Sequence, residues 1–369
     1  MHLAADRAIP DLELNLLKLF DKQEFNITYF QGDEFSYLDQ KDIDILLIRS
    51  TTKINETTLN NHSIKFIGSV TSGIDHLDIN FLKQIGIEWG HAPGCNAWSV
   101  VHYVMSALEV IYSQGLGTIG NGVGIVGYGN IGSRLASVLK ALRIPYSVFD
   151  PFVFSSSSQS IKDALCHDVV TLHVPLSYTG NFPTYHLINR KELEELKFKT
   201  LINTSRGGVI NESILNEFSS INLILDVWEQ EPVIEERFFR ESFLYTPHIA
   251  GYSIDGKNNG TRMIIQALAS FLGRSISNEL ISIPGKQISK AEFLKFQENF
   301  HSYSFPTGLF SKSLDLFEIM YSFKQDFERG ESLSSIREKH PPRRDFIHDT
   351  FMGEKLENLE ILSKLIDIY

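Results

Sequence analysis

The fold of this chain is indicated most strongly by the stretch Gly124-Ile125-Val126-Gly127-Tyr128-Gly129-Asn130-Ile131-Gly132. Its G-x-G-x-x-G pattern lies between an apolar run that predicts a strand and a helical pattern over residues 131–142. There the first glycine permits a tight turn, the second lets backbone approach a pyrophosphate, and the third lets helix pack on strand. Amides at the helix start then face the anion. The candidate dinucleotide-binding residues are Gly127, Gly129, Asn130, Ile131 and Gly132, although glycines that merely make a turn would give the same pattern.

An acidic residue follows the next predicted strand. Asp150 ends the run 146–149 and lies 18 residues after Gly132 (150 − 132), close to the spacing of about 20 expected of a ribose-binding acid. Its carboxylate would accept hydrogen bonds from both ribose hydroxyls and would repel a 2′-phosphate. The sequence has no arginine next to it. The predicted cofactor is therefore NAD rather than NADP.

Short apolar runs alternate with helical patterns on both sides of this stretch. Strands are predicted at residues 43–48, 64–68, 123–126, 146–149, 169–173, 200–203, 223–226 and 244–246. Such alternation predicts βαβ units and a doubly wound parallel sheet of the α/β class. The sequence becomes more charged beyond Pro284, so a domain boundary is placed near residue 285.

Composition limits the class of protein. The chain has 369 residues, 43% of them hydrophobic, which is enough for two or three domains. It has no apolar run of about 18 residues and no amino-terminal signal pattern, and its two cysteines, Cys95 and Cys166, lie far apart. We therefore expect a cytoplasmic protein without a membrane partner or a metal site. The formal net charge of −11 disfavours a nucleic-acid partner, so an anionic substrate needs locally placed arginine or lysine.

Three residues with the chemistry of an alcohol-oxidising site follow in order. His248 comes after Pro247 at the end of an apolar run, which places it at the carboxyl edge of the sheet, where open α/β sheets bind ligands. An imidazole there can take the hydroxyl proton during oxidation. Glu231 could hold its other nitrogen, and Arg206, at the end of another strand, could clamp a carboxylate beside the reacting carbon. Each residue taken alone is better explained as structural.

Five ordered motifs identify a family. They are GIDHLD at 73–78, the glycine pattern with Asp150, NTSRG at 203–207, DVWEQEP at 226–232 and TPH at 246–248. Together they resemble the D-isomer-specific 2-hydroxyacid dehydrogenases over roughly the first 280 residues. The resemblance implies that the catalytic residues are Arg206, Glu231 and His248. It also implies that NAD is contacted by Asp150, Thr204, Ser205, Asp226 and Gly251, and through the backbone by Val174, which stands where the family often has a threonine.

A closer likeness to one branch of the family is carried by residues 48–53, 93–97, 248–253 and 343–345. It implies a phosphorylated 2-hydroxy acid as substrate, contacted by Arg49, Ser50, Thr71 and Tyr252, with Lys53 near the phosphate. It implies a flavodoxin-like substrate (lid) domain (1–95 plus 256–285), a Rossmann-type NAD-binding domain (96–255) and a small C-terminal α+β dimerisation domain (286–369).

A homodimer is the expected assembly. Apolar residues at helical spacing in the tail, such as Leu314, Phe317 and Tyr321, favour an interface there. The sets 293–300 and 356–365 have the same spacing. In such a dimer Arg343 and Arg344 could reach the partner's phosphate pocket and help to hold a dianion.

The leading hypothesis is NAD-dependent oxidation of a phosphorylated 2-hydroxy acid to its 2-oxo acid. Arg206 would hold the C1 carboxylate, His248 would take the C2 hydroxyl proton, and Glu231 would support His248. Two other functions stay open at this point. One is a dehydrogenase for a different 2-hydroxy acid, such as 3-phosphoglycerate. The other is a non-catalytic NAD-sensing regulator, like the corepressors that share this fold, which would need a peptide groove that the sequence does not indicate.

Overall fold

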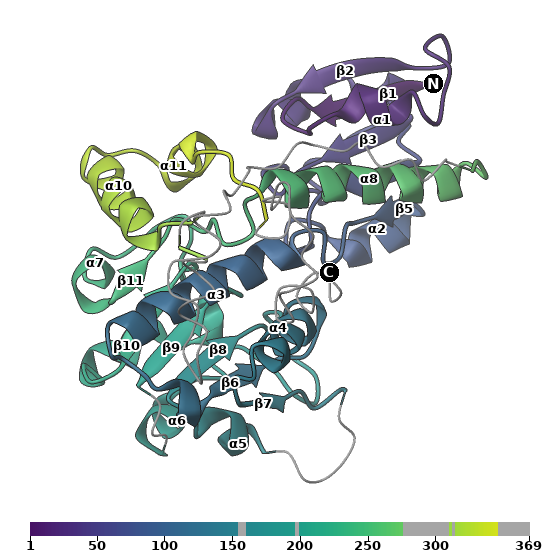
Figure 1. Ribbon diagram of the computed structural model, residues 1–369. Coiled ribbons are helices and arrows are strands. Elements are labelled where there is room, and N and C mark those ends of the chain that lie inside the picture. Colours follow the sequence, from purple (N-terminus) through teal and green to yellow (C-terminus); the bar gives the residue numbers. More distant parts are fainter. Residues whose placement is uncertain (154–159, 196–198, 276–309, 312–313, 346–369) are drawn as a thin grey trace, which may run out of the picture. The chain divides into compact units, whose positions relative to one another are not determined.

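The computed structural model describes residues 1–153, 160–195, 199–275, 310–311 and 314–345. These residues form two compact units, each built around a parallel β-sheet (Figure 1). The first unit contains residues 1–96 and 253–275, and the second contains residues 97–252 with the described residues from 310 onward. The chain is therefore of the α/β class, as its alternating pattern predicts.

The first unit has a five-stranded sheet in the order β2-β1-β3-β4-β5. All four strand pairings are parallel. The strands are β1 (His2–Asp6), β2 (Asn26–Phe30), β3 (Ile45–Ile48), β4 (Phe66–Ser69) and β5 (Glu88–Gly90). The order is the flavodoxin-like one, so the expected flavodoxin-like fold is confirmed. The helical segments are α1 (Leu12–Leu16), η1 (Gly32–Tyr37), η2 (Gln40–Asp42), α2 (Ile79–Ile85) and α8 (Ile254–Phe271).

Both faces of this sheet are buried. Along β1, Leu3 packs into one apolar cluster and the next residue, Ala4, packs into another, because successive side chains of a strand point to opposite faces. Along β3, Leu46 and Leu47 alternate in the same way. Two-sided burial explains why these strands read as continuous apolar runs in the sequence.

The second unit has a six-stranded parallel sheet in the order β11-β10-β9-β8-β6-β7. The strands are β6 (Val123–Val126), β7 (Tyr146–Phe149), β8 (Val169–Leu172), β9 (Thr200–Asn203), β10 (Asn222–Leu225) and β11 (Leu244–Tyr245). After β7 the chain returns to the other side of β6 to form β8. Ligands of doubly wound sheets bind in the crevice at such a reversal, outside the carboxyl ends of the strands. The Rossmann-type fold is therefore confirmed.

The helical segments of this unit follow the predicted alternation. They are α3 (Ala97–Ser113), η3 (Ile119–Asn121), α4 (Asn130–Ala141), α5 (Ile161–Leu165), α6 (Arg190–Glu195), η4 (Gly207–Val209), η5 (Glu212–Glu217), α7 (Phe238–Glu241), α10 (Leu316–Glu328) and α11 (Leu333–Lys339). The observed strands begin and end within two residues of the predicted ones. The predicted helical stretch from 212 to 218 is a 3₁₀ segment, η5.

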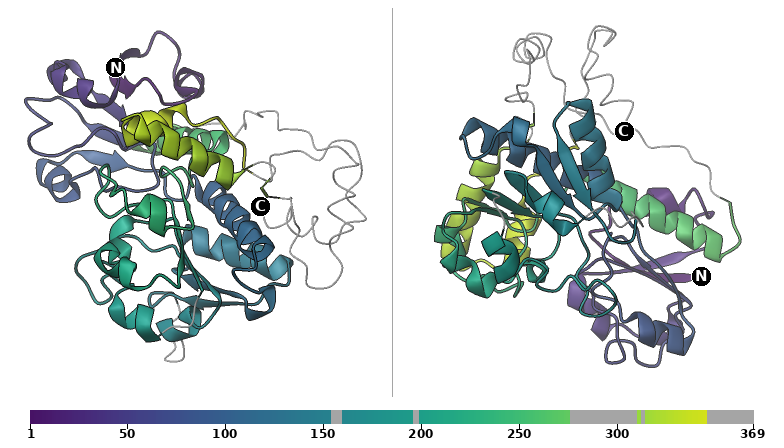
Figure 2. Two further views of the ribbon diagram at one scale, coloured as in Figure 1. Left: turned by 90° about the vertical axis from the view of Figure 1, so that its left-hand side faces the viewer. Right: turned by 90° about the horizontal axis from the view of Figure 1, so that it is seen from below.

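The described part of the tail packs on its own chain. Leu314 is buried in one apolar cluster of the second unit, and Phe323 of α10 is buried in another. Phe317 rests edge-on against Phe243, whereas Tyr321 is 66% exposed. Figure 1 shows α10 next to β11, and Figure 2 shows α10 and α11 as the two yellow helices that lie side by side. The apolar sets at 293–300 and 356–365 lie outside the described residues, and the three-domain division stays a prediction.

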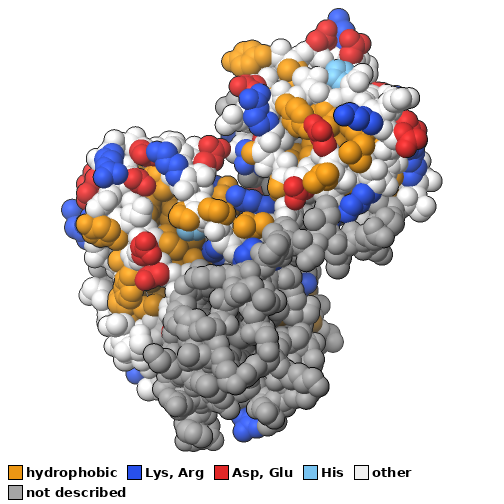
Figure 3. Space-filling model, turned by 45° about the horizontal axis from the view of Figure 1, so that its top comes forward, with side chains coloured by type: hydrophobic (Ala, Val, Ile, Leu, Met, Phe, Trp, Pro, Cys, Tyr) orange, Lys and Arg blue, Asp and Glu red, His pale blue; other side chains and the backbone are white. Residues whose placement is uncertain are grey.

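On the face in Figure 3, acidic and basic side chains are interspersed. Among the described residues, no helix is long and apolar enough to cross a membrane. The same residues contain no group of three or more histidine, cysteine or acidic side chains placed to hold a metal ion.

Candidate active site

The predicted site residues of the second unit follow the carboxyl ends of its strands. Gly127 comes directly after β6, and Asp150 comes directly after β7. Thr204 follows β9, Asp226 follows β10, and Thr246 follows β11. Because neighbouring parallel strands are in register here, these loops emerge from one edge of the sheet.

The glycine-rich loop has little room for side chains at two of its glycines. Gly127 has a φ of +98°, and a Cβ there would lie 2.4 Å from the carbonyl oxygen of His173. A Cβ at Gly132 would lie 2.0 Å from the carbonyl oxygen of Gly127, so the helix packs directly on the turn. At Gly129 a Cβ would meet nothing within 4 Å. This open position and the start of α4, which no side chain caps, fit a pyrophosphate.

Asp150 fixes the same loop. Its Oδ2 accepts a hydrogen bond from the amide of Tyr128 (2.8 Å), and its Oδ1 accepts one from Phe152 (2.9 Å). A carboxylate oxygen can accept more than one hydrogen bond, so Asp150 can hold the loop and still accept from ribose hydroxyls. The residues present therefore fit the adenosine half of NAD.

Three other residues predicted to contact NAD differ in their surroundings. Thr204 Oγ1 is buried and has no hydrogen-bond partner within the described residues, which suits a group that awaits a ligand. Ser205 Oγ donates to Asn203 Oδ1 at 2.8 Å. Val174 lies beside the glycine-rich loop, where its Cγ1 would be 3.0 Å from a Cβ at Gly127.

His248 and Glu231 form a hydrogen-bonded pair, as their chemistry suggests. Nδ1 of His248 lies 2.7 Å from Oε2 of Glu231, and the two side chains are 29% and 24% exposed. Glu231 Oε1 accepts from the amide of Trp228, which orients the carboxylate. Burial raises the pKa of Glu231, but the hydrogen bond and charge of His248 outweigh burial and leave that pKa below its usual value. Nε2 is the nitrogen left to act on a substrate hydroxyl.

The backbone of His248 is in the left-handed region, with a φ of +57°. Residues other than glycine adopt this region at a cost and need neighbouring contacts to stay there. Asp226 supplies such contacts, because its Oδ1 accepts from Ile249 N and its Oδ2 from Ala250 N, both at 2.8 Å. Asp226 also accepts from Thr246 Oγ1 at 2.6 Å, and burial raises its pKa. It therefore holds the histidine turn, a role that the sequence did not indicate.

Arg206 lies between β9 and η4. Its Nη1 donates to the carbonyl oxygen of Ser205 at 2.8 Å, and its own carbonyl accepts from Asn203 Nδ2 at 2.9 Å. A Cβ at Gly207 would lie 1.9 Å from the carbonyl carbon of Trp228, so the Arg206 loop touches the loop that carries Glu231. This contact brings Arg206, the predicted carboxylate-binding residue, into the same region as Glu231.

A second histidine–glutamate pair lies in the same unit. His186 Nε2 is 2.7 Å from Glu229 Oε1, and the side chains are 23% and 22% exposed. His186 stacks on Tyr185 with ring centroids 3.9 Å apart. A short histidine–carboxylate distance alone therefore does not identify the base. The turn held by Asp226 distinguishes His248.

Two predicted substrate residues of the first unit lie in polar contacts. Arg49, which follows β3, donates from Nε to Oδ1 of the fully buried Asp6 at 3.0 Å. Thr71 Oγ1 donates to the carbonyl of Gly73 (2.8 Å) and is bonded to Ser69 Oγ (2.7 Å). Asp6 was not predicted, although a carboxylate at the last position of β1 was a signal for it.

The remaining predicted residues are placed as follows. Ser50 and Lys53 are exposed on the loop after β3. Tyr252 of the second unit lies under Arg337, whose guanidinium carbon is 5.1 Å from the ring centroid. The charge of Arg337 also helps to lower the pKa of Glu231. Arg337 was not expected at this position.

The tail arginine Arg343 contradicts one expectation. It is 7% exposed, and its Nη2 donates to the carbonyl oxygen of Ala250 at 2.6 Å in the same chain. A guanidinium that is buried against its own backbone cannot also reach a partner's phosphate pocket. That expectation is wrong for Arg343.

Comparisons with known proteins agree with this geometry. A family profile described as "D-isomer specific 2-hydroxyacid dehydrogenase, NAD binding domain" matches residues 111–250. Among solved structures, an NAD-bound 3-phosphoglycerate dehydrogenase of Entamoeba histolytica has a TM-score of 0.62 at 20% identity, covering 77% of this chain and 99% of its own. A D-lactate dehydrogenase of Aquifex aeolicus has a TM-score of 0.58 at 22% identity over 74% and 96% of the two chains. At these identities the structures establish the fold alone.

Closer relatives carry a more specific name. The erythronate-4-phosphate dehydrogenase of Wigglesworthia glossinidia brevipalpis is 41% identical over 280 residues, which is 73% of this chain and 71% of the relative. That of Hahella chejuensis is 39% identical over 76% and 74% of the two chains. This chain therefore belongs to the erythronate-4-phosphate dehydrogenase family, a branch of the NAD-dependent D-isomer-specific 2-hydroxyacid dehydrogenases.

Proposed function

We propose that this protein oxidises 4-phospho-D-erythronate to (R)-3-hydroxy-2-oxo-4-phosphooxybutanoate with NAD, a step of pyridoxal 5′-phosphate (vitamin B6) biosynthesis. The observation that carries the proposal is that Glu231 lies 2.7 Å from His248 on a turn held by Asp226, at the carboxyl edge of an NAD-binding sheet. The substrate is taken from the name of relatives such as the one from Wigglesworthia glossinidia brevipalpis, which is 41% identical. Those names do not favour 3-phosphoglycerate as substrate or a non-catalytic sensor.

The chemistry follows from the groups at the strand ends. Arg206 binds the C1 carboxylate, because its planar guanidinium matches a carboxylate. The C2 hydroxyl gives its proton to Nε2 of His248, since Nδ1 is engaged by Glu231. Ionised Glu231 stabilises the resulting imidazolium. Bound NAD supplies the acceptor for the hydride from C2.

Binding is assigned to two sets of residues. NAD is held by Gly127, Gly129, Asn130, Ile131, Gly132, Asp150, Val174, Thr204, Ser205, Asp226 and Gly251. Substrate is held by Arg49, Ser50, Thr71 and Tyr252. The pairing of Arg49 with buried Asp6 fixes its guanidinium, while exposed Lys53 adds a second cation on the same loop for the phosphate dianion.

We also propose a cytoplasmic homodimer with the three domains described above. Cys95 and Cys166 form no disulfide with each other, which suits a reducing compartment. The exposed ring of Tyr321 on α10 is available to a second copy. Light scattering should give a mass of about 84 kDa (2 × 41.9 kDa). A mass of one chain at micromolar concentration would reject the dimer.

The activity is tested with purified protein, NAD and a panel of 2-hydroxy acids. We expect kcat/KM to be highest for 4-phospho-D-erythronate and lower for 3-phosphoglycerate and for unphosphorylated D-erythronate. The His248→Ala variant, prepared in parallel, reports contaminating activity. A clear preference for another acid would reject the substrate, and no oxidation of any acid would reject the enzyme assignment.

A further inference from the structure

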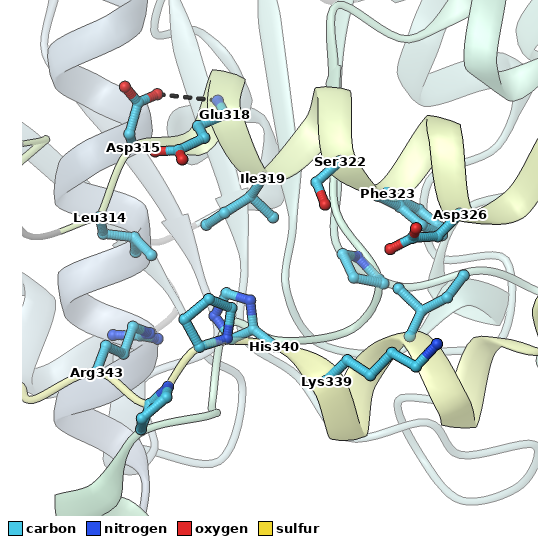
Figure 4. A pocket seen from close by; sticks show the side chains of 14 residues that line it. Leu314, Asp315, Glu318, Ile319, Ser322, Phe323, Asp326, Lys339, His340 and Arg343 are labelled. Carbon is cyan, nitrogen blue, oxygen red and sulfur yellow. Dashed lines mark hydrogen bonds between the residues drawn. The ribbon is translucent and has the colours of Figure 1, made fainter.

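Arg343 reaches the catalytic turn from the far end of the chain. It lies in the segment after α11, and its guanidinium is buried in the second unit. Nη2 donates to the carbonyl oxygens of Ala250 (2.6 Å) and Ile249 (3.4 Å) and to that of Ser99 in α3 (3.3 Å). Figure 4 shows Arg343 next to α3, at the edge of a pocket of about 350 Å³ lined by α10 and the end of α11.

Two of the three carbonyls that Arg343 binds belong to the residues directly after His248. The amides of the same two residues donate to Asp226. The peptide groups of Ile249 and Ala250 are therefore held by an anion at their N–H groups and by a cation at their C=O groups. Hydrogen bonds to charged groups are the stronger kind, and burial strengthens them further.

The contacts from Asp226 and Arg343 lie next to a residue with an unfavourable backbone conformation. His248 has a φ of +57°, and its ring must stay where Nδ1 meets Glu231. A turn of this kind persists only where surrounding contacts fix it. His102 lies 3.4 Å from Nη1 of Arg343, and burial with the charge of Arg343 lowers the pKa of His102 to about 3. His102 is therefore neutral and does not repel the guanidinium.

We propose that Arg343 is a positioning residue for the catalytic histidine, and that the C-terminal tail thereby completes the active site of its own chain. Its guanidinium is buried and bonds backbone carbonyl oxygens. It acts through the carbonyls of Ile249 and Ala250, which keep His248 aligned with Glu231. The inference builds on the proposed function, because it assigns the tail a part in the same proton transfer.

The test compares Arg343→Met and Arg343→Lys with the control Arg329→Met. The control removes the same charge from an exposed tail position that pairs with Asp326. We expect kcat to fall about 100-fold in Arg343→Met, the cost of a base displaced by about 1 Å. Arg343→Lys should recover part of the loss, because an ammonium can still reach one carbonyl. Affinity for ADP-ribose, which binds away from His248, should stay at the wild-type value in all three variants.

A spectroscopic measurement makes the test independent of turnover. The Nδ1 proton of His248, bonded to Glu231, should give a low-field resonance that is missing in His248→Ala. In Arg343→Met and Arg343→Lys this resonance should weaken or shift, while Arg329→Met keeps it. Should the methionine variant fail to fold, the lysine variant decides alone.

The outcomes separate the two proposals. Wild-type protein that oxidises no 2-hydroxy acid would reject the function, while the resonance would still report on Arg343. A folded Arg343→Met with wild-type kcat and an unchanged His248 resonance would overturn the inference; where only Arg343→Lys folds, a lysine variant that matches the wild type in both measurements would do so.

Discussion

The pairing of His248 with Glu231 makes a quantitative prediction for Glu231→Gln. The 2.7 Å bond joins two partly buried groups, and a hydrogen bond to a charged group contributes about 1.5–3 kcal/mol. At about 1.4 kcal/mol per tenfold change in an equilibrium constant, losing this hydrogen-bond energy corresponds to a shift of roughly one to two pH units in the activity profile. Ionised Glu231 and protonated His248 stabilise each other, which is why the pKa of Glu231 is lowered. Glutamine removes that charge, so the neutral imidazole needed for oxidation persists to lower pH.

The assay is kcat/KM for oxidation between about pH 5 and 9, because that ratio reports ionisations of the free enzyme. The acidic limb should move down by about one pH unit or more in Glu231→Gln. Glu229→Gln is the matched control, since Glu229 makes an equally short bond to His186 with similar exposure. Its profile should match the wild type. Superimposable profiles for Glu231→Gln and wild type would remove Glu231 from the catalytic pair.

Three further predictions concern other parts of the second unit. Asp150→Ser combined with Pro151→Arg should relax the preference for NAD, and wild-type protein that uses NADP equally well would contradict the role of Asp150. His248→Ala should lower kcat about 10²–10⁴-fold. Arg206→Ala should lower kcat and also raise KM for the substrate. If the two variants changed kcat and KM to the same extent, the separate roles of base and carboxylate clamp would be contradicted. Burial raises the pKa of Glu212 from 4.5 to about 8, so this group destabilises the fold increasingly as pH rises from 4.5 to 8. Glu212→Gln should therefore raise the free energy of unfolding by about 3 kcal/mol at pH 7 and by little at pH 4. Urea unfolding measures this free energy at each pH. A difference between variant and wild type that stays the same from pH 4 to pH 7 would refute the prediction.

Much of the fold was predictable because its signals are local. The central strands β3, β4, β6, β8 and β9 are buried on both faces, so they appear as apolar runs in the sequence. Asp78 caps the amide of Phe81 at the start of α2, and Gly86 ends that helix with a φ of +73°. The glycine-rich loop was predictable for a similar reason, since Gly127 and Gly132 stand where a Cβ would collide with backbone.

What the sequence did not reveal depends on contacts between distant residues. Asp226 was predicted only as a cofactor ligand, and its carboxylate also accepts hydrogen bonds from the turn after β11. Tyr103 in α3 donates to or accepts from Thr246 at 2.7 Å, across 143 residues. No local pattern marks such partners. Arg343 was misassigned for the same reason, because a charged residue in a polar tail usually lies on the surface.

The contact of Arg343 with the turn after His248 makes the active site depend on a segment that is synthesised much later than the turn. The strands of the second unit are complete at Tyr245, but Arg343 is translated 93 residues after Ala250. Contacts across such separations form late, because a long loop must close first. A nascent chain can therefore carry the glycine-rich loop and His248 before the turn has its final bonds. Truncated products of interrupted translation would keep the means to bind NAD while lacking a fully aligned base.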